Sequence, residues 1–264
     1  MRVAIVGGGV MGEAILSRAL AQGVLALKDV IVAEVIEVRR AQLQDVYGVE
    51  TTAVAGAATA EADVVVISVK PQEAKSATAT LKADSLLVSI MAGVRIATLA
   101  ADFGHDRIVR VMPNTPAGIG AGMSVWTATE AVSDTQREFT RALLSAIGRE
   151  LYVPDEKKLD MATAVSGSGP AYVFLFIEAM VEGAVAVGLS RAQAEEMVLQ
   201  TVYGAALYAR ESGRSAAELR AAVTSPAGTT AAGLLELERG ALRAHVIEAV
   251  AAAHRRSVEL GGPA

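Results

Sequence analysis

Short apolar runs alternate with helical patterns along the first part of the chain. The apolar runs predict β-strands over residues 2–6, 29–34, 51–54, 63–69, 85–90 and 107–112. Residues 63–69 are almost continuously apolar, which is typical of a strand buried on both faces of a parallel sheet. Helical patterns such as Glu13–Ala21 and Arg39–Tyr47 lie between these runs. Strands that alternate with helices predict a parallel sheet with right-handed crossover connections.

Helical patterns alone follow from about residue 155 onwards. Before that point two further strands are predicted, over residues 124–128 and 150–153. Three capping boxes, each a serine followed three residues later by a glutamine or glutamate, predict helix starts at Ser133, Ser190 and Ser215. The last helical stretch, residues 236–259, contains Gly240 as a candidate break.

The pattern as a whole predicts an α/β fold with two domains. Residues 1–160 form a Rossmann-like dinucleotide-binding domain, and residues 161–264 form an all-α domain. One helical stretch, Pro170–Val187, is apolar on almost every side, with Glu178 and Glu182 as its only charges. Such a helix is buried in a core or in a subunit interface. We therefore favour an all-α dimerisation domain over the alternative, the core of a monomeric bundle.

A glycine-rich turn joins the first strand to the first helix. Gly7, Gly9 and Gly12 fit G-x-G-x-x-G, whose glycines permit a tight turn, the approach of a pyrophosphate and close helix packing. The helix N-terminus offers free N–H groups to phosphates. Glu34 ends the second strand 22 residues after Gly12, close to the spacing of about 20 expected for a ribose ligand. We predict a dinucleotide site here; the alternative is a turn that only packs.

Other cofactor ligands are expected where later strands end, because ligands of such sheets bind beyond the carboxyl ends of the strands. The predicted cofactor-binding residues are Gly7, Gly8, Gly9, Val10, Met11, Gly12, Glu34, Ser68, Val69, Lys70, Pro71, Ala92 and Asn114. The side chain of Lys70 either contacts a phosphate or ribose or is solvated. Asn114 is the only asparagine of the chain. Its amide suits a nicotinamide carboxamide or a ribose, or it holds its own loop as an Asx turn.

Composition excludes several kinds of site. The 264 residues include no cysteine, which excludes disulfides, thiolate nucleophiles and cysteine metal sites. The three histidines are widely spaced, so no metal site is predicted. A net charge of −5 without a lysine-rich run argues against nucleic acid as a partner. No leader precedes the first strand and no uncharged apolar stretch reaches the ~20 residues of a membrane span. We therefore expect a cytoplasmic protein that does not cross a membrane.

Two segments rich in glycine and hydroxyl groups occur in the helical half. In Ser166–Pro170, helix capping explains the serines and a first-turn position explains the proline. Thr224–Thr230 combines four hydroxyl residues with a proline and a glycine, more than capping needs, and its N–H groups suit a small carboxylate. No residue is placed as an obvious general acid. A protonated imine needs less acid assistance than a carbonyl, which favours the reduction of C=N over C=O.

Five motifs together resemble the Δ1-pyrroline-5-carboxylate reductase family, over residues 1 to about 260. They are V-G-G-G-V-M-G at 6–12, S-V-K-P at 68–71, R-V-M-P-N-T-P at 110–116, L-D through S-G-S-G-P-A-Y at 159–172 and T-S-P-A-G-T-T at 224–230. The last three motifs, in this order, are specific to the family. The resemblance implies reduction of pyrroline-5-carboxylate to L-proline, the last step of proline biosynthesis, with NADPH or NADH. It also implies a homodimer with interlocking helical domains, which in the family often assembles into a decamer.

The resemblance further implies which residues form the substrate site. Backbone amides of the segment matching Ser225–Thr230 hold the substrate carboxylate at the dimer interface, under the nicotinamide. The implied substrate-binding residues are Ser225, Gly228, Thr229, Thr230 and Glu156. The hydroxyl of Thr230 is the implied catalytic group, because it reaches the ring nitrogen while hydride attacks the imine carbon.

The chain departs from the family pattern at two places. Many members have Gly-Gly where this chain has Ala227-Gly228, so one carboxylate-binding position carries a methyl group. Many NADPH-preferring members have a reader of the 2′-phosphate after the second strand, whereas this chain has Glu34-Val35. A carboxylate there favours a 2′-hydroxyl and repels a 2′-phosphate. Arg39 and Arg40 are candidates to compensate, so the choice between NADH and NADPH stays open.

Two other functions compete with this interpretation. A β-hydroxyacid dehydrogenase also combines a Rossmann half with a helical half, but it uses a lysine with an asparagine four residues later in the helical domain. This chain has no asparagine beyond Asn114. A non-catalytic nucleotide-sensing protein has no need of the hydroxyl-rich segment Thr224–Thr230.

Overall fold

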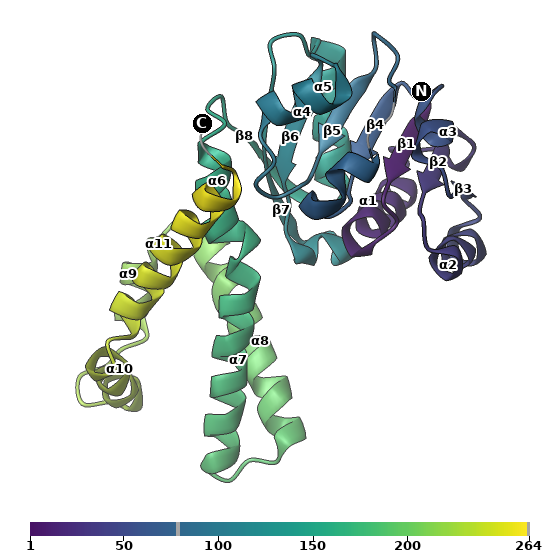
Figure 1. Ribbon diagram of the computed structural model, residues 1–264. Helices are drawn as coiled ribbons and strands as arrows, with labels where there is room; N and C mark the ends of the chain where they lie inside the picture. The colour runs from purple at the N-terminus through teal and green to yellow at the C-terminus, as the bar shows by residue number, and fades with distance from the viewer. Residues whose placement is uncertain (78–79, 263–264) are drawn as a thin grey trace. The chain divides into compact units, whose positions relative to one another are not determined.

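The computed structural model describes residues 1–77 and 80–262, and Figure 1 shows its helices and strands. The chain forms two compact units. The first comprises Met1–Ser168 together with Ala252–Ala264, and the second comprises Gly169–Ala251. The predicted domains, residues 1–160 and 161–264, differ from these units because the end of the last helix packs with the first unit.

Among the described residues, the first unit contains an eight-stranded sheet with the order β3-β2-β1-β4-β5-β6-β7-β8. The strands are β1 Val3–Val6, β2 Val30–Ala33, β3 Glu50–Thr52, β4 Val64–Ile67, β5 Leu86–Ser89, β6 Ile108–Met112, β7 Gly122–Ala128 and β8 Gly148–Tyr152. The strands β1 to β6 are parallel, as predicted, but β7 is antiparallel to β6. The sequence pattern made no prediction for the direction of β7. Only the 3-10 turn η3, Thr115–Ile119, joins β6 to β7, and it is too short for a crossover helix.

Helices cover both faces of this sheet. They are α1 Val10–Ala21, α2 Glu37–Tyr47, α3 Ala55–Thr59, α4 Ile96–Phe103, α5 Asp134–Ala146 and α6 Lys158–Ala162, with the 3-10 turns η1 Leu27–Asp29 and η2 Pro71–Ala77. Side chains of α1, α2 and α5 pack with Val3 and Ile5 of β1, whereas those of α3 and α4 pack with Ala4 and Val6. Successive strand residues point to opposite faces. The strands are thus buried on both faces, which explains their continuous apolar runs.

The second unit is helical. The helices α7, Gly169–Ala186, and α8, Arg191–Glu211, lie side by side in Figure 1 and pack through Val181, Ala194 and Val198. The remaining helices are α9 Ala216–Ala222, α10 Thr229–Arg239 and α11 Leu242–Leu260, of which α11 continues into the first unit. The three predicted capping boxes are confirmed at the starts of α5, α8 and α9. The predicted break at Gly240 is confirmed as the end of α10.

The apolar surface of α7 is larger than the single chain covers. Phe174 and Leu175 are 58% and 67% exposed. A turn of π-helix, η4 Thr163–Gly167, joins α6 to α7, so the helical run is longer than the sequence pattern indicated. As a result, Lys158–Ala186 is long and apolar enough to span a membrane by length and composition, although it includes charged residues such as Asp160 and Glu178. Helices that pack in the core of a protein pass the same test, and α7 packs on α8.

Candidate functional site

The glycine turn lies where β1 ends and α1 begins. Gly7 has a φ of +103°, and a Cβ there would lie 2.9 Å from the backbone of Ser68. A Cβ on Gly12 would lie 2.1 Å from the carbonyl oxygen of Gly7. Gly9, in contrast, has no atom within 4 Å of the position of a Cβ. Gly7 therefore permits the tight turn and Gly12 the close packing of the helix. Gly9 leaves the open backbone that a pyrophosphate requires.

The start of α1 has unsatisfied N–H groups. Its N-cap is Gly9, and no side chain caps the helix. The N–H groups of the first turn and the positive end of the helix dipole are therefore available to an anion. Gly9 and Val10 are exposed and Met11 is half-buried. These residues fit the phosphates of a dinucleotide.

The neighbouring strands β4 and β5 bring further predicted ligands to the same edge of the sheet. The hydroxyl of Ser68, just after β4, donates to the carbonyl oxygen of Gly7 at 2.7 Å and holds the glycine turn. Lys70 and Pro71 are exposed, whereas Val69 is half-buried and packs on the core. Ala92, after β5, is exposed. Because β1, β4 and β5 are parallel, their carboxyl ends meet at one edge.

Glu34 binds the glycine turn directly. Its Oε2 accepts a hydrogen bond from the N–H of Gly8 at 2.8 Å, and its Oε1 accepts one from the N–H of Ile36 at 2.9 Å. A Cβ on Gly8 would lie 3.3 Å from that Oε2 and 2.6 Å from Cδ1 of Leu43. Gly8 therefore lets the carboxylate approach the turn, and the two backbone bonds fix its position.

A polar network that the sequence pattern does not predict surrounds the same turn. Arg39 donates through Nε to the carbonyl oxygen of Gly8 at 2.7 Å and forms an ion pair with Glu13. The hydroxyl of Tyr47 donates to Glu13 at 2.9 Å. Burial acts to raise the pKa of Glu13, but hydrogen bonds from Arg39 and Tyr47 and the charge of Arg39 together hold that pKa below its usual value. No motif links these residues in the sequence, so no signal could have found the network.

Asn114 joins two segments of the first unit. Its Oδ1 accepts a hydrogen bond from the N–H of Met123 at 2.8 Å, and its Nδ2 donates to the carbonyl oxygen of Ser166 at 2.9 Å. These contacts support the alternative that the amide holds its loop, although as a bridge between segments rather than an Asx turn. Its role as a cofactor ligand stays a prediction.

Glu156 lies in a cluster of charged residues in the first unit. Its Oε1 accepts from Nη1 of Arg110 at 2.7 Å and from the N–H of Ile96, the first residue of α4, at 2.8 Å. Nη2 of Arg110 lies 3.9 Å from Oδ1 of Asp160, which accepts from the hydroxyl of Ser257 at 2.8 Å. These contacts are structural, and a substrate contact of Glu156 stays a prediction. One signal was available: Arg110 is a charged residue within an apolar strand pattern.

The hydroxyl-rich segment Thr224–Thr230 belongs to the second unit and ends in the first turn of α10. The N-cap of α10 is Gly228, with no side-chain cap, and the exposed Thr229 and Thr230 are the first two helical residues. A Cβ on Gly228 would lie 2.3 Å from the hydroxyl of Ser225, so a larger residue there would require that hydroxyl to move. The first-turn N–H groups of α10 are thus left for another acceptor.

Ala227, which precedes this N-cap, has a φ of +59°. This is the left-handed conformation that glycine adopts without strain. It agrees with the family resemblance, in which a glycine is common at this position.

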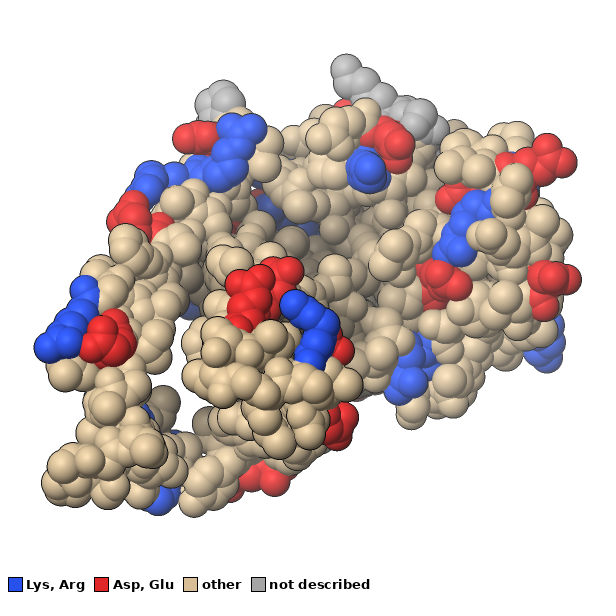
Figure 2. All heavy atoms as spheres, turned by 90° about the horizontal axis from the view of Figure 1, so that it is seen from below, with Lys and Arg blue, Asp and Glu red and all other residues tan. Residues whose placement is uncertain are grey.

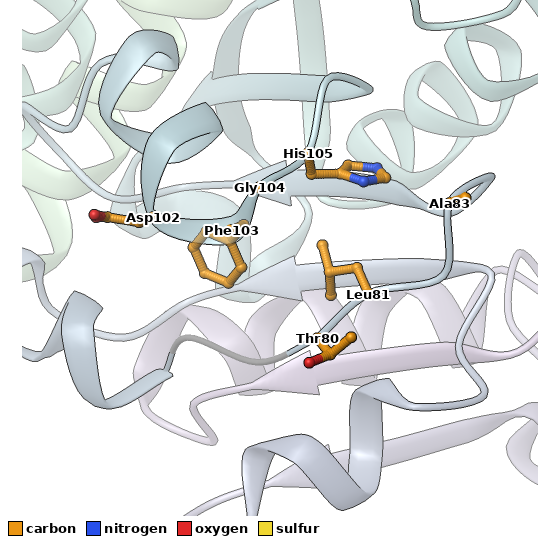
Figure 3. Close-up of a pocket in the computed structure, with 7 residues that line it drawn as sticks. All are labelled: Thr80, Leu81, Ala83, Asp102, Phe103, Gly104 and His105. Carbon is orange, nitrogen blue, oxygen red and sulfur yellow. The ribbon is translucent and has the colours of Figure 1, made fainter.

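A separate hollow lies at the amino ends of β5 and β6. Figure 3 shows its lining residues, which come from the segment before β5 and from the end of α4: Thr80, Leu81, Ala83, Asp102, Phe103, Gly104 and His105. Nε2 of His105 lies 2.7 Å from the carbonyl oxygen of Ser85, as expected of a structural hydrogen bond. Ligands of parallel sheets bind at the carboxyl ends of the strands. This hollow is therefore not part of the predicted cofactor site.

On the face drawn in Figure 2, the basic side chains are scattered among acidic and neutral ones. Within residues 1–77 and 80–262, no group of three or more histidine, aspartate or glutamate side chains is arranged to hold a metal ion.

Two family comparisons match separate parts of the chain. Residues 156–260 match the family described as pyrroline-5-carboxylate reductase dimerisation. Residues 2–93 match the family described as NADP oxidoreductase, coenzyme F420-dependent. The chain is 43% identical to the pyrroline-5-carboxylate reductase of Synechocystis, over 99% of this chain and 98% of that protein. It is 40% identical to the Arabidopsis thaliana protein of the same name, over 98% and 95% of the two chains.

The chain belongs to the pyrroline-5-carboxylate reductase family. The solved structure of the Coxiella burnetii reductase has a TM-score of 0.90 and 34% identity, and the alignment covers 99% of each chain. The Plasmodium falciparum enzyme, described with NADP bound, has a TM-score of 0.89 and 29% identity, over 99% of this chain and 98% of that one. These comparisons confirm the predicted fold class. The reductase dimerisation match includes all of α7 to α11, which indicates that the chain forms a homo-oligomer.

Proposed function

We propose that this chain reduces 1-pyrroline-5-carboxylate to L-proline, the last step of proline biosynthesis, with NADPH or NADH as the hydride donor. The observation that carries this proposal is the full-length similarity to proteins of that name, at 40–43% identity. The chain spans nearly the whole length of these relatives, so it includes both a nucleotide-binding part and a helical part.

The glycine turn and the neighbouring strand ends would hold the dinucleotide. The open backbone at Gly9 and the uncapped start of α1 suit the pyrophosphate, and Glu34 suits the adenosine ribose. When bound, the reduced nicotinamide supplies the hydride. Ser68–Pro71, Ala92 and Asn114 are proposed to complete the cofactor site from the ends of β4, β5 and β6.

The start of α10 is proposed to bind the substrate carboxylate. The helices α5, α8 and α9 begin with serine capping boxes, whereas α10 begins at Gly228 without one. A carboxylate at this position satisfies the free N–H groups of Thr229 and Thr230 and interacts favourably with the helix dipole. Ser225 and Gly228 shape the turn that precedes these groups.

Thr230 is proposed to hold the ring nitrogen through its hydroxyl. A protonated imine already carries the proton that the amine keeps after reduction. The chain then has to position the imine carbon rather than supply a strong acid. Hydroxyl groups and backbone amides, which are not strong acids, are sufficient for this positioning role.

We further propose that the working form is a dimer with interlocked helical domains, which assembles further into a decamer. The exposed apolar side chains of α7, including Phe174 and Leu175, support burial against a second copy. Glu156 as a substrate contact and a cytoplasmic location stay predictions.

Product analysis tests the proposed function. The purified protein is incubated with 1-pyrroline-5-carboxylate and either reduced nucleotide, and proline is measured by mass spectrometry. We expect proline to form only when both reactants are present. A parallel incubation with NAD⁺ or NADP⁺ and a panel of β-hydroxyacids tests the competing dehydrogenase function. Oxidation of a β-hydroxyacid without any formation of proline would overturn the proposal.

A further inference from the structure

We propose that Glu34 makes this enzyme select NADH over NADPH, and that Arg39 and Arg40 do not serve as readers of a 2′-phosphate. This inference rests on the proposed function, because it concerns the nucleotide site of the same reaction. It goes beyond that function, which leaves the nucleotide open.

The carboxylate of Glu34 retains hydrogen-bonding capacity beyond its two bonds to the backbone. A carboxylate has about four acceptor positions. Two of them are used, one on each oxygen, by the N–H groups of Gly8 and Ile36. Each oxygen therefore keeps one free position, and two neighbouring ribose hydroxyls are donors of matching number.

A 2′-phosphate would meet a fixed negative charge at this position. Glu34 is only 9% exposed, and its two backbone bonds prevent the carboxylate from swinging away without loss of both. Because the site is largely removed from water, the repulsion between a phosphate and this carboxylate is weakly screened. The same charge attracts and orients a 2′-hydroxyl.

The two nearby arginines are already engaged. The guanidinium of Arg39 binds the carbonyl oxygen of Gly8 and the carboxylate of Glu13. Nη1 of Arg40 donates to the carbonyl oxygens of Glu34 and Val35, at 2.7 Å and 2.9 Å. A turn of Arg39 to a 2′-phosphate would break its contacts and leave Glu13 without its ion pair, and the two carbonyl bonds of Arg40 hold its guanidinium beside the backbone of Glu34 and Val35. The arginines thus stabilise the turn that presents Glu34.

Exposed apolar side chains surround the same position. Val35 and Ile36, directly after β2, are 79% and 61% exposed, and Val54, after the adjacent β3, is 61% exposed. An adenine ring has a flat apolar face that fits side chains of this kind. The end of β2 therefore offers a surface for the base next to a carboxylate for its ribose.

Titration calorimetry of the whole protein with NAD⁺ and NADP⁺, in the absence of substrate, tests the proposal without turnover. We expect NAD⁺ to bind at least about tenfold more tightly than NADP⁺, a difference of about 1.4 kcal/mol. In Glu34→Gln, this ratio should fall about tenfold, because the charge is gone while the side chain keeps its length. Equal affinities in the unchanged protein, or the same ratio in Glu34→Gln, would overturn the proposal.

Two further variants keep the test decisive. Glu37→Gln removes an exposed charge three residues away and should leave the ratio unchanged, so an equal effect there would contradict a specific role of Glu34. If Glu34→Gln does not fold, Glu34→Asp retains the charge but shortens the reach. We expect it to bind NAD⁺ more weakly and still to reject NADP⁺, and unchanged binding of NAD⁺ would overturn the proposal.

The two proposals can fail separately. If the protein prefers NAD⁺ through Glu34 but forms no proline, the proposed function fails and the nucleotide selection stands. If it forms proline with a kcat/KM for NADPH equal to or above that for NADH, the proposed function stands and the nucleotide selection fails.

Discussion

Nη1 of Arg110 lies 2.7 Å from Oε1 of Glu156, so an arginine buried on β6 is paired with a carboxylate that is 46 residues further along the chain. The same carboxylate oxygen accepts the N–H of Ile96 at the start of α4. This pair therefore connects a central strand, the segment before α6 and the first turn of a helix that follows the predicted cofactor loop at Ala92.

The first prediction concerns this pair. Glu156→Gln should lower the free energy of unfolding by about 2 kcal/mol, since it leaves the 3%-exposed side chain of Arg110 without its nearest charged partner. Urea unfolding at one fixed protein concentration measures the change. Glu130→Gln, at an exposed position, is the control and should change the same quantity by less than about 0.5 kcal/mol. If Glu156→Gln leaves the free energy of unfolding unchanged but raises the KM for pyrroline-5-carboxylate, Glu156 instead acts at the substrate.

The second prediction concerns pH and Glu13. The pKa of Glu13 in the folded chain is below its usual value, despite the opposing effect of burial, because Arg39 and Tyr47 bind the carboxylate. The unfolded chain therefore takes up the proton first, and the stabilisation by this group is present near neutral pH and declines as the pH falls through about 4. The stability difference between the unchanged protein and Glu13→Gln, measured by urea unfolding, should shrink over this range. A difference that stays constant from neutral pH to about pH 3 would contradict the assignment.

The third prediction separates substrate positioning from nucleotide binding. Thr230→Ala should lower turnover by about tenfold to a hundredfold, as expected for the loss of one hydrogen bond to a charged group, while affinity for the nucleotide is retained. Thr224→Ala is the matched control, because the hydroxyl of Thr224 donates to the carbonyl oxygen of Arg220 at 2.6 Å. Steady-state kinetics and nucleotide titration of both variants measure the two effects. Equal turnover in the two variants would remove Thr230 from the reaction.

The fourth prediction concerns the left-handed residue before α10. Ala227→Val should lower the free energy of unfolding by about 1–3 kcal/mol, because a β-branched residue is strained at a φ of +59°. Ala241→Val is the control, since Ala241 has a φ of +53° in the turn between α10 and α11. Both variants should be destabilised, but only Ala227→Val should raise the KM for pyrroline-5-carboxylate. A similar KM in the two variants would show that Ala227 has no part in substrate binding.

Local signals in the sequence predicted the local structure well. The serine caps at Ser133, Ser190 and Ser215 depend on residues three positions apart, so they could be identified without any tertiary information. The glycine turn and Glu34 follow from a spacing that the βαβ unit imposes. Apolar runs likewise predicted the strands, because a strand buried on both faces has to be apolar throughout.

Features that depend on distant parts of the chain could not be predicted in this way. The direction of β7 depends on how the short segment Thr115–Ile119 turns the chain back, and strand propensity has no direction. The bond between Asp160 and Ser257 joins residues 97 positions apart, and neither side chain has a distinctive neighbour in the sequence. The hydrogen bond between Glu34 and the N–H of Gly8 was likewise not predicted. The sequence predicted only that Glu34 lies near the ribose.

The most direct test of the central claim follows the hydride itself. The protein is supplied with 1-pyrroline-5-carboxylate and with NADH that carries deuterium at both positions of C4 of the nicotinamide, and the product is examined by mass spectrometry and nuclear magnetic resonance. We expect proline that carries deuterium on the former imine carbon and on no other carbon. Oxidation of the nucleotide without formation of deuterated proline, or proline without the label at that carbon, would contradict the account.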